Sequence, residues 1–322
     1  MTGYAQWLRR EVGPALLPLA YVTAIVRDSA GRILFQRRAD FGAAWWGLPG
    51  GLFEPGETPA ECLRREVLEE TGLRVEPRRL TGLYSSLRYR VIYPNGDQVQ
   101  QVTFCYECDW LGGQLRPQTE EVQDLELFAP EALPPRPLWY ADMLARALAA
   151  RPMPYFDPPE PASVDAPYPS PKSLRAVVGA APLLWPGVAA VVLDGAGRLL
   201  LQRRAENGLW DLPGGLIETG ESLAHTAQRE TREATGLEVE PERLLDSYAG
   251  DEVVYANGDR SFPVGALFAC RLIGGQPRPD GHKTAEVGFF ARDRLPPLDP
   301  PVARLAGQVL AEPGYNPPTS QP

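Results

Sequence analysis

The sequence contains an internal repeat that spans nearly half of the chain. GRILFQRRA at residues 31–39 returns as GRLLLQRRA at 197–205, and YPNGD at 93–97 returns as YANGD at 255–259. The 24 residues that begin at Gly50 share 13 identities, without a gap, with those that begin at Gly214. This period is one whole domain, far longer than the unit of a solenoid. The sequence therefore predicts two copies of the same domain.

A proline-rich segment separates the copies. Residues 151–172 contain eight prolines, and proline continues neither a helix nor a central strand. We therefore expect a first domain at residues 1–150, a linker at 151–172 and a second domain at 173–322. A duplicated chain can pair its own halves, so an intrachain pseudo-dimer is expected as well.

Each copy has the same coarse order of elements. In the first, a short helix precedes two strands, YVTAIVRD and RILFQRR, and two glycines then break the chain before an acidic helix. Two strands flank the Asn95-Gly96 turn, and a last strand and a terminal helix follow. Strands and helices mix without strict βαβ alternation. This predicts an α/β fold with a mixed β-sheet between helices.

Composition and charge exclude several classes of protein. The net charge of −9 argues against a protein that follows a nucleic-acid backbone with a basic surface. Both histidines, His225 and His282, lie in the second copy, which excludes a Ser–His or Cys–His nucleophile in the first. The N-terminus lacks the apolar core of a signal peptide, and prolines interrupt the uncharged run at 176–193, so no membrane partner is expected.

Cysteine is sparse. Cys105 and Cys108 lie three residues apart in an alternating strand pattern, so they should point to opposite faces and not share a metal. Such usage fits a reducing compartment, and we expect a cytoplasmic location.

The acidic helix of the first copy has clear start and stop signals. Thr58 can cap it, Pro59 suits its first turn, Glu61 completes a capping box and Gly72 can end it in a left-handed conformation. Leu63 and Val67 should face the sheet, beside a stripe that carries Glu66, Glu69 and Glu70.

These three glutamates repel one another unless positive charge lies among them. Arg65 can pair with Glu69 four residues on, but a divalent cation is the more complete solution because Mg²⁺ prefers carboxylate oxygens. For an acidic helix alone, a solvated charged face stabilised by Arg64 and Arg65 is the favoured interpretation.

The complete pattern decides between these interpretations because it resembles the signature of the Nudix hydrolase family (MutT-like proteins). The matching positions are Gly51, Glu57, Arg65, Glu66, Val67, Glu69, Glu70, Gly72 and Leu73. A match of this length is highly specific. The resemblance covers both copies and implies two Nudix folds in tandem.

The resemblance also implies an activity. Nudix enzymes use water to cleave a pyrophosphate bond in a nucleoside diphosphate linked to another group, and they require Mg²⁺ or Mn²⁺. It implies that Glu66, Glu69 and Glu70 bind the metal, with the Gly51 carbonyl as a further ligand. It implies that Arg65 orients these glutamates and that Glu57 braces the junction between loop and helix. The general base is left open; Glu120 and Glu121 are candidates for an additional acid.

Elementary chemistry agrees with this assignment, because diphosphate cleavage needs cations on the phosphoryl oxygens and an activated water. Arg37, Trp46 and Tyr93 are weaker candidates for substrate contacts, and for each aromatic residue packing is the alternative. The expected partner is a small-molecule nucleoside diphosphate derivative rather than a nucleic acid.

The second copy departs from the pattern. It keeps Gly215, Glu221, Arg229, Glu230 and Glu233, but Ala234 replaces the third glutamate. His282 and Lys283 stand where the first copy has Glu120 and Glu121. These changes remove negative charge where a metal would lie and predict a degenerate site, with catalysis in the first domain. The alternative function is a nucleotide-responsive binding or regulatory protein with vestigial catalysis.

Overall fold

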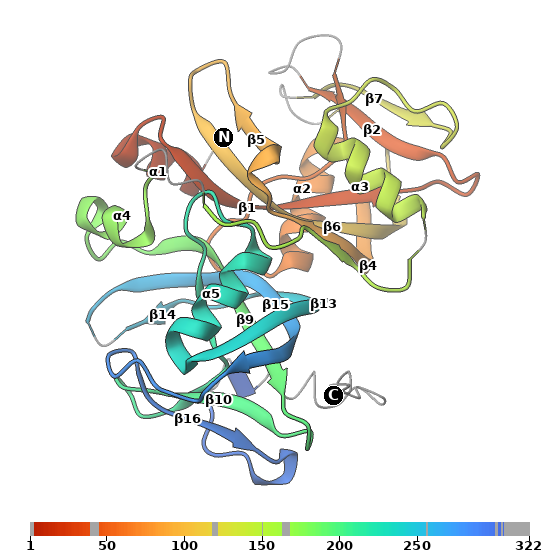
Figure 1. Cartoon of the computed structure of the whole chain (residues 1–322). Helices are drawn as coiled ribbons and strands as arrows, with labels where there is room; N and C mark the ends of the chain where they lie inside the picture. Colours follow the sequence, from red (N-terminus) through yellow and green to blue (C-terminus); the bar gives the residue numbers. More distant parts are fainter. Residues whose placement is uncertain are drawn as a thin grey trace.

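The computed structural model describes residues 3–38, 45–117, 122–149, 151–162, 168–255, 257–299, 302–303 and 305. Each half places helices against mixed β-sheet, as predicted (Figure 1). The first half contains α1 (Tyr4–Val12), β1 (Leu16–Val26), β2 (Ile33–Arg38), β3 (Trp46–Gly47), α2 (Pro59–Thr71), β4 (Leu73–Tyr84), η1 (Leu87–Tyr89), β5 (Arg90–Ile92), β6 (Gln98–Gly113), β7 (Val122–Phe128) and α3 (Leu138–Leu148).

The second half repeats this order after one short strand in the linker. Its elements are β8 (Tyr155–Phe156), α4 (Pro171–Val178), β9 (Leu183–Leu193), β10 (Leu199–Arg204), β11 (Trp210–Asp211), β12 (Gly214–Leu216), α5 (Leu223–Thr235), β13 (Leu237–Ala249), β14 (Val253–Val254), β15 (Arg260–Gly275), β16 (Thr284–Phe290) and η2 (Arg292–Arg294). The uncharged run at 176–193 is the end of α4, a loop and β9. Among the described residues, no helix is long and apolar enough to cross a membrane.

The central pairing of each half is parallel: β1 pairs with β6, and β9 pairs with β15. The predicted hairpin at Asn95-Gly96 joins the antiparallel strands β5 and β6. The two strands expected on either side of residue 30 meet only at a bridge between Arg27 and Ile33. They belong to different sheets because β2 pairs with β7 and β3 in a sheet of its own.

The acidic helices lie with their apolar stripes against the sheets. Leu63 and Val67 of α2 are fully buried, as the helical spacing predicts. In α5 the matching positions are Ala227 and Thr231, which are also fully buried, and the Thr231 hydroxyl has no hydrogen-bond partner. The second helix therefore packs less apolar surface than the first. The two central-strand cysteines fall in different core clusters, and all four cysteines are free and buried.

The two halves share one hydrophobic core cluster and several polar contacts. The Gln100 side chain on β6 donates to the Glu221 carbonyl at 2.6 Å and accepts from the Gly220 N–H at 2.7 Å. The Ser85 hydroxyl accepts from the Leu223 N–H at 3.0 Å. Residues of the first half thus hold the loop that leads into α5.

The proline-rich linker is bound to both halves. Phe156 packs edge-on against Phe268 of the second half, with ring centroids 5.2 Å apart. The Asp157 carboxylate, whose side chain is fully buried, accepts from the Ser85 and Ser86 N–H groups at 2.7 and 3.0 Å. The Glu160 backbone exchanges hydrogen bonds with Ser222, the N-cap of α5.

We expect Asp157→Ala to lower the free energy of unfolding by about 3–5 kcal/mol, because it leaves two buried N–H groups and the facing Tyr155 hydroxyl without their acceptor. Urea unfolding of the full chain measures this loss. The exposed Glu131→Ala is the matched control and should change stability by less than about 0.5 kcal/mol. Equal stabilities of the two variants would mean that the linker is not anchored at Asp157.

Candidate functional site

The loop and helix of the first site form through local signals. The Thr58 hydroxyl accepts from the Glu61 N–H, and the Glu61 carboxylate accepts from the Thr58 N–H, which makes the predicted capping box. Gly72 ends α2 with φ 73°, in the left-handed region that favours glycine. The helix therefore begins and ends where the sequence predicts, and this fixes the direction of every glutamate on it.

Arg65 is the hub of the acidic face. Its guanidinium binds both carboxylate oxygens of Glu57, at 2.5 and 2.9 Å, and one oxygen of Glu66 at 2.7 Å. It also contacts Glu69 at 3.3 Å and donates to the Leu52 carbonyl at 3.0 Å. One planar cation thus ties the loop to the helix and holds the carboxylates near one another.

Glu57 braces the loop from within. Its carboxylate also accepts from the Glu54 N–H at 2.9 Å. Burial acts to raise the pKa of Glu57, but its hydrogen bonds with Arg65 and with the Glu54 N–H outweigh burial and hold that pKa below its ordinary value. Glu57 therefore stays ionised, as a brace requires.

Glu66 lies against Gly51, where the glycine leaves room for its carboxylate. A Cβ atom at residue 51 would lie 2.3 Å from the Glu66 carboxylate. The Gly51 carbonyl accepts from the Val22 N–H at 2.9 Å, which leaves it one further lone pair. Burial raises the pKa of Glu66, with Arg65 acting in the opposite direction. Glu69, by contrast, is more than half exposed at the rim of this face.

Glu70 is the buried carboxylate of the site. It accepts from the Gly50 N–H at 2.8 Å, and its other oxygen lies 3.6 Å from the Arg38 guanidinium. Burial raises the pKa of Glu70 to about 8, although Arg38, the Gly50 N–H and Gln36 all act to lower it. A carboxylate in this position takes up either a proton or an additional positive charge.

The donor set fits a hard divalent cation in its chemistry, because all of its groups are carboxylate or carbonyl oxygens. In the described part of the chain, however, no three His, Cys, Asp or Glu side chains already stand close enough together to hold a metal ion. Arg65 engages Glu66 and Glu69, while Glu70 turns toward Gly50 and Arg38. Metal binding at this face would require these side chains to reorient.

The weaker sequence candidates lie in different places. Arg37 forms a 3.5 Å ion pair with Asp124, and its guanidinium lies 5.8 Å from the centroid of Trp46. Trp46 in turn packs edge-on against Phe128. Glu120 and Glu121 lie outside the described residues, which omit 118–121.

Sequence reasoning missed Tyr21, which lies near Arg38, and three residues that interact with Glu70: Gln36, Arg38 and Tyr140. Arg38, not Arg37, reaches it, because alternate residues of β2 point to opposite faces. The Tyr140 ring of α3 packs where Gly47 leaves room, since a Cβ atom there would lie 2.8 Å from the ring. Burial raises the pKa of Tyr140 to about 12, and both Arg38 and Glu70 act on it. Tyr21 of β1 is next to Tyr93, the predicted hairpin residue, and burial and then Tyr93 raise its pKa.

The second half repeats the hub but not the buried carboxylate. Arg229 binds Glu221 at 2.7 and 3.0 Å, Glu230 at 2.6 Å and Glu233 at 3.4 Å. A Cβ atom at Gly215 would meet the Glu230 carboxylate at 2.2 Å. At the position of Glu70 stands the buried methyl group of Ala234.

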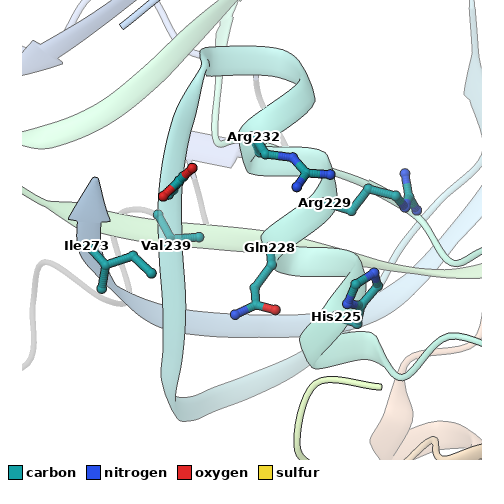
Figure 2. Close-up of a pocket in the computed structure, with 7 residues that line it drawn as sticks. His225, Gln228, Arg229, Arg232, Val239 and Ile273 are labelled. Atoms are coloured by element: carbon teal, nitrogen blue, oxygen red, sulfur yellow. The ribbon is translucent and has the colours of Figure 1, made fainter. Parts of the chain in front are cut away.

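A cleft of about 200 Å³ lies on the second half, between α5 and strands β13 and β15 (Figure 2). Figure 2 shows His225, Gln228, Arg229 and Arg232 on α5, with Gln228 on the side toward Val239 and Ile273 and with Arg229 directed away from them. Of the residues in the acidic pattern, Arg229 alone lines it, and the guanidinium of Arg229 is engaged with three glutamates. This cleft therefore borders the second acidic face, because Arg229 is the hub of that face and His225 Nε2 lies 3.7 Å from Glu221 Oε1.

Comparison with known proteins gives a consistent result for both halves. The model of the NUDIX domain matches residues 17–147 and again residues 183–312. A MutT-like protein of Streptomyces ambofaciens is 40% identical over 114 residues, which are 35% of this chain and 68% of that protein.

Two further relatives carry the names of specific enzymes. An ADP-ribose pyrophosphatase of Methanocaldococcus jannaschii is 32% identical over 34% of this chain and 66% of its own length. The NAD-capped RNA hydrolase NudC of Pseudomonas syringae is 30% identical over 38% of this chain and 41% of its own length. The chain thus spans between 41% and 68% of these three relatives.

Proposed function

Because the chain belongs to the Nudix family, as a pyrophosphohydrolase with two tandem domains, we propose that its first half hydrolyses a pyrophosphate bond in a nucleoside diphosphate linked to another group. This proposal rests on the buried carboxylate of Glu70, which lies beside the acidic face that Arg65 holds together. Burying such a group is costly unless positive charge compensates it. The second half has no carboxylate at this position, and we propose that it does not catalyse.

Mg²⁺ or Mn²⁺ is the proposed cofactor, and Glu66, Glu69, Glu70 and the Gly51 carbonyl are the groups that would hold it. When bound, such a cation supplies charge neutralisation at phosphoryl oxygens and lowers the pKa of a bound water. Arg65 orients Glu66 and Glu69 through hydrogen bonds, and Glu57 fixes Arg65 to the loop. The proposed substrate contacts are Arg38, Tyr140, Tyr21 and Tyr93. Arg38 and Tyr140 interact with Glu70, and Tyr21 lies next to Tyr93 and near Arg38.

The domain boundaries at 1–150, 151–172 and 173–322 remain part of this proposal, together with a pseudo-dimer of the two halves. The shared core cluster and the Gln100 and Ser85 contacts support a fixed pairing. A small-molecule substrate and a cytoplasmic location are proposed as well; the acidic net charge and four free cysteines support them.

A panel of nucleoside diphosphate derivatives tests the function. We expect the full chain to release a phosphate-containing product from at least one of them with Mg²⁺ or Mn²⁺ present, and none after EDTA treatment. The panel includes an ADP-sugar, a dinucleotide and a capped RNA. Turnover of one of them and not of the others would show which of the reactions named for its relatives this chain performs. Binding of these compounds without turnover in either metal would instead support a nucleotide-responsive binding protein.

A further inference from the structure

The second half kept an arginine whose partner is gone. Arg204 on β10 is the counterpart of Arg38, and Ala234 is the counterpart of Glu70. Losing the glutamate alone would leave a partly buried guanidinium, one third exposed, with Glu206 at 3.7 Å as its remaining acid among the described residues. Instead, Arg204 donates to the Asp211 carboxylate through Nε at 2.6 Å and makes a second, shorter contact with the same oxygen. Asp211 is 6% exposed, so the acid of this ion pair is buried while the guanidinium is partly exposed.

Asp211 occupies a position that cannot carry a side chain in the first half. Its counterpart is Gly47, where a Cβ atom would lie 2.8 Å from the Tyr140 ring. In the second half the repeat places Val302 where the first has Tyr140, and Val302 is buried. Exchanging the tyrosine for valine removes the ring that excludes a side chain at Gly47. Three differences between the halves therefore belong together: Glu70 to Ala234, Gly47 to Asp211 and Tyr140 to Val302.

The glycine loop loses a carboxylate acceptor in the second half, because Ala234 stands at the position of Glu70. Gly50 has φ 144° and directs its N–H to Glu70. Gly214, its counterpart, lies in β12 and pairs with Ala189 of β9. Both loops are otherwise bonded to the neighbouring strand alike: the Ala24 N–H donates to the Pro49 carbonyl and the Ala190 N–H donates to the Pro213 carbonyl, each at 2.8 Å.

Lys283 adds positive charge to the remaining acids. Its backbone is fixed by hydrogen bonds with the Asp280 carboxylate and the Ala205 N–H. Burial raises the pKa of Glu230, and Arg229 and then Lys283 act to lower it. The first half carries Glu121 at the position of Lys283.

We propose that the Arg204–Asp211 ion pair replaces the buried carboxylate of the catalytic helix, so that the second acidic face is balanced by the chain's own cations and binds no divalent metal. In the second half, the carboxylate that pairs with this arginine therefore lies on a strand, whereas in the first half it lies on the helix. The inference concerns the second site alone and requires no hydrolytic activity in the first.

A double-mutant cycle on the full chain tests this exchange. Asp211→Gly removes the partner of Arg204, and Ala234→Glu places a buried carboxylate beside a guanidinium that Asp211 already occupies. Each change is expected to lower Tm by about 5 °C in metal-free buffer. The double variant restores the helix glutamate and the strand glycine of the first half, with Val302 unchanged, so its loss should be less than half of the summed losses. Additive losses would overturn the proposal; Asp211→Asn replaces the glycine variant if the latter does not fold.

Mn²⁺ titration of the same protein tests the metal statement. Glu230→Gln should leave the number of bound Mn²⁺ ions unchanged, whereas Glu66→Gln, its matched counterpart, should reduce it. Loss of bound Mn²⁺ in Glu230→Gln would show that the second face is a metal site and would contradict the proposal, whether or not the first half proves to be a hydrolase.

Discussion

Glu70→Gln is expected to lower kcat/KM by at least about 100-fold, which corresponds to about 2.7 kcal/mol of transition-state stabilisation. Glutamine keeps an acceptor for the Gly50 N–H, so the loop and helix should hold their positions. It removes the negative charge that, in the proposed mechanism, holds the cation and pairs with Arg38. The measurement is steady-state kinetics with the substrate that the panel identifies, at saturating Mg²⁺ or Mn²⁺.

Stability provides an independent readout of the same variant. Burial raises the pKa of Glu70 to about 8 from an ordinary value of 4.5, so between these pH values the folded metal-free protein binds a proton that the unfolded chain releases. Its stability therefore falls as pH rises from about 4.5 to 8. Glutamine does not titrate.

Metal-free Glu70→Gln should accordingly have a higher Tm than the parent at pH 8 and a similar Tm at pH 4.5. Added Mn²⁺ should stabilise the parent at pH 8 more than it stabilises the variant. Normal turnover by the folded variant would remove Glu70 from the proposed mechanism. A Tm at pH 8 below that of the metal-free parent would show that the Glu70 carboxylate is already compensated by Arg38 alone.

The local part of the site could be predicted from the sequence because its signals are local. The capping box at Thr58 and the left-handed Gly72 set the ends of the helix, and the helical repeat then places Glu66, Glu69 and Glu70 on one stripe. The same holds for the Asn95-Gly96 hairpin, whose turn chemistry lies in adjacent residues.

Contacts between distant segments could not be predicted in this way. Period-2 alternation shows that Arg37 and Arg38 point to opposite faces of a strand, but only the sheet into which β2 is built decides that Arg38 meets Glu70. The prolines of the linker predict an extended chain, yet not the buried site that receives Asp157.

At the second site, too, contacts between distant residues could not be predicted from the sequence. The loss of a carboxylate at Ala234 is visible in the repeat, whereas its replacement requires knowing that residues 204 and 211 are neighbours on antiparallel strands. Comparing the two repeats therefore shows only that a carboxylate is lost from the helix. The fold shows that a different carboxylate, on the neighbouring strand, pairs with the arginine instead.

The two arginine hubs allow catalysis and structure to be separated within one chain. Arg65 and Arg229 bind equivalent partners: the loop glutamate, two helix glutamates and a loop carbonyl. Arg65→Ala and Arg229→Ala should each lower the free energy of unfolding by about 2–3 kcal/mol, because each leaves partly buried carboxylates without a cation. Their effects on turnover should differ.

Arg65→Ala is expected to lower kcat/KM by about 100-fold, since Glu57, Glu66 and Glu69 lose their common partner next to the proposed metal site. Arg229→Ala should leave kcat/KM within about twofold of the parent, because its glutamates lie in the half without the buried helix carboxylate. Circular dichroism confirms that both proteins are folded at the assay temperature, and the lysine variants replace them if they are not. Comparable losses of turnover in the two variants would show that catalysis needs both acidic faces. If only Arg65→Ala loses turnover, while both variants lose the same stability, the reaction takes place in the first half. General destabilisation cannot explain such a result, because it would affect both variants equally.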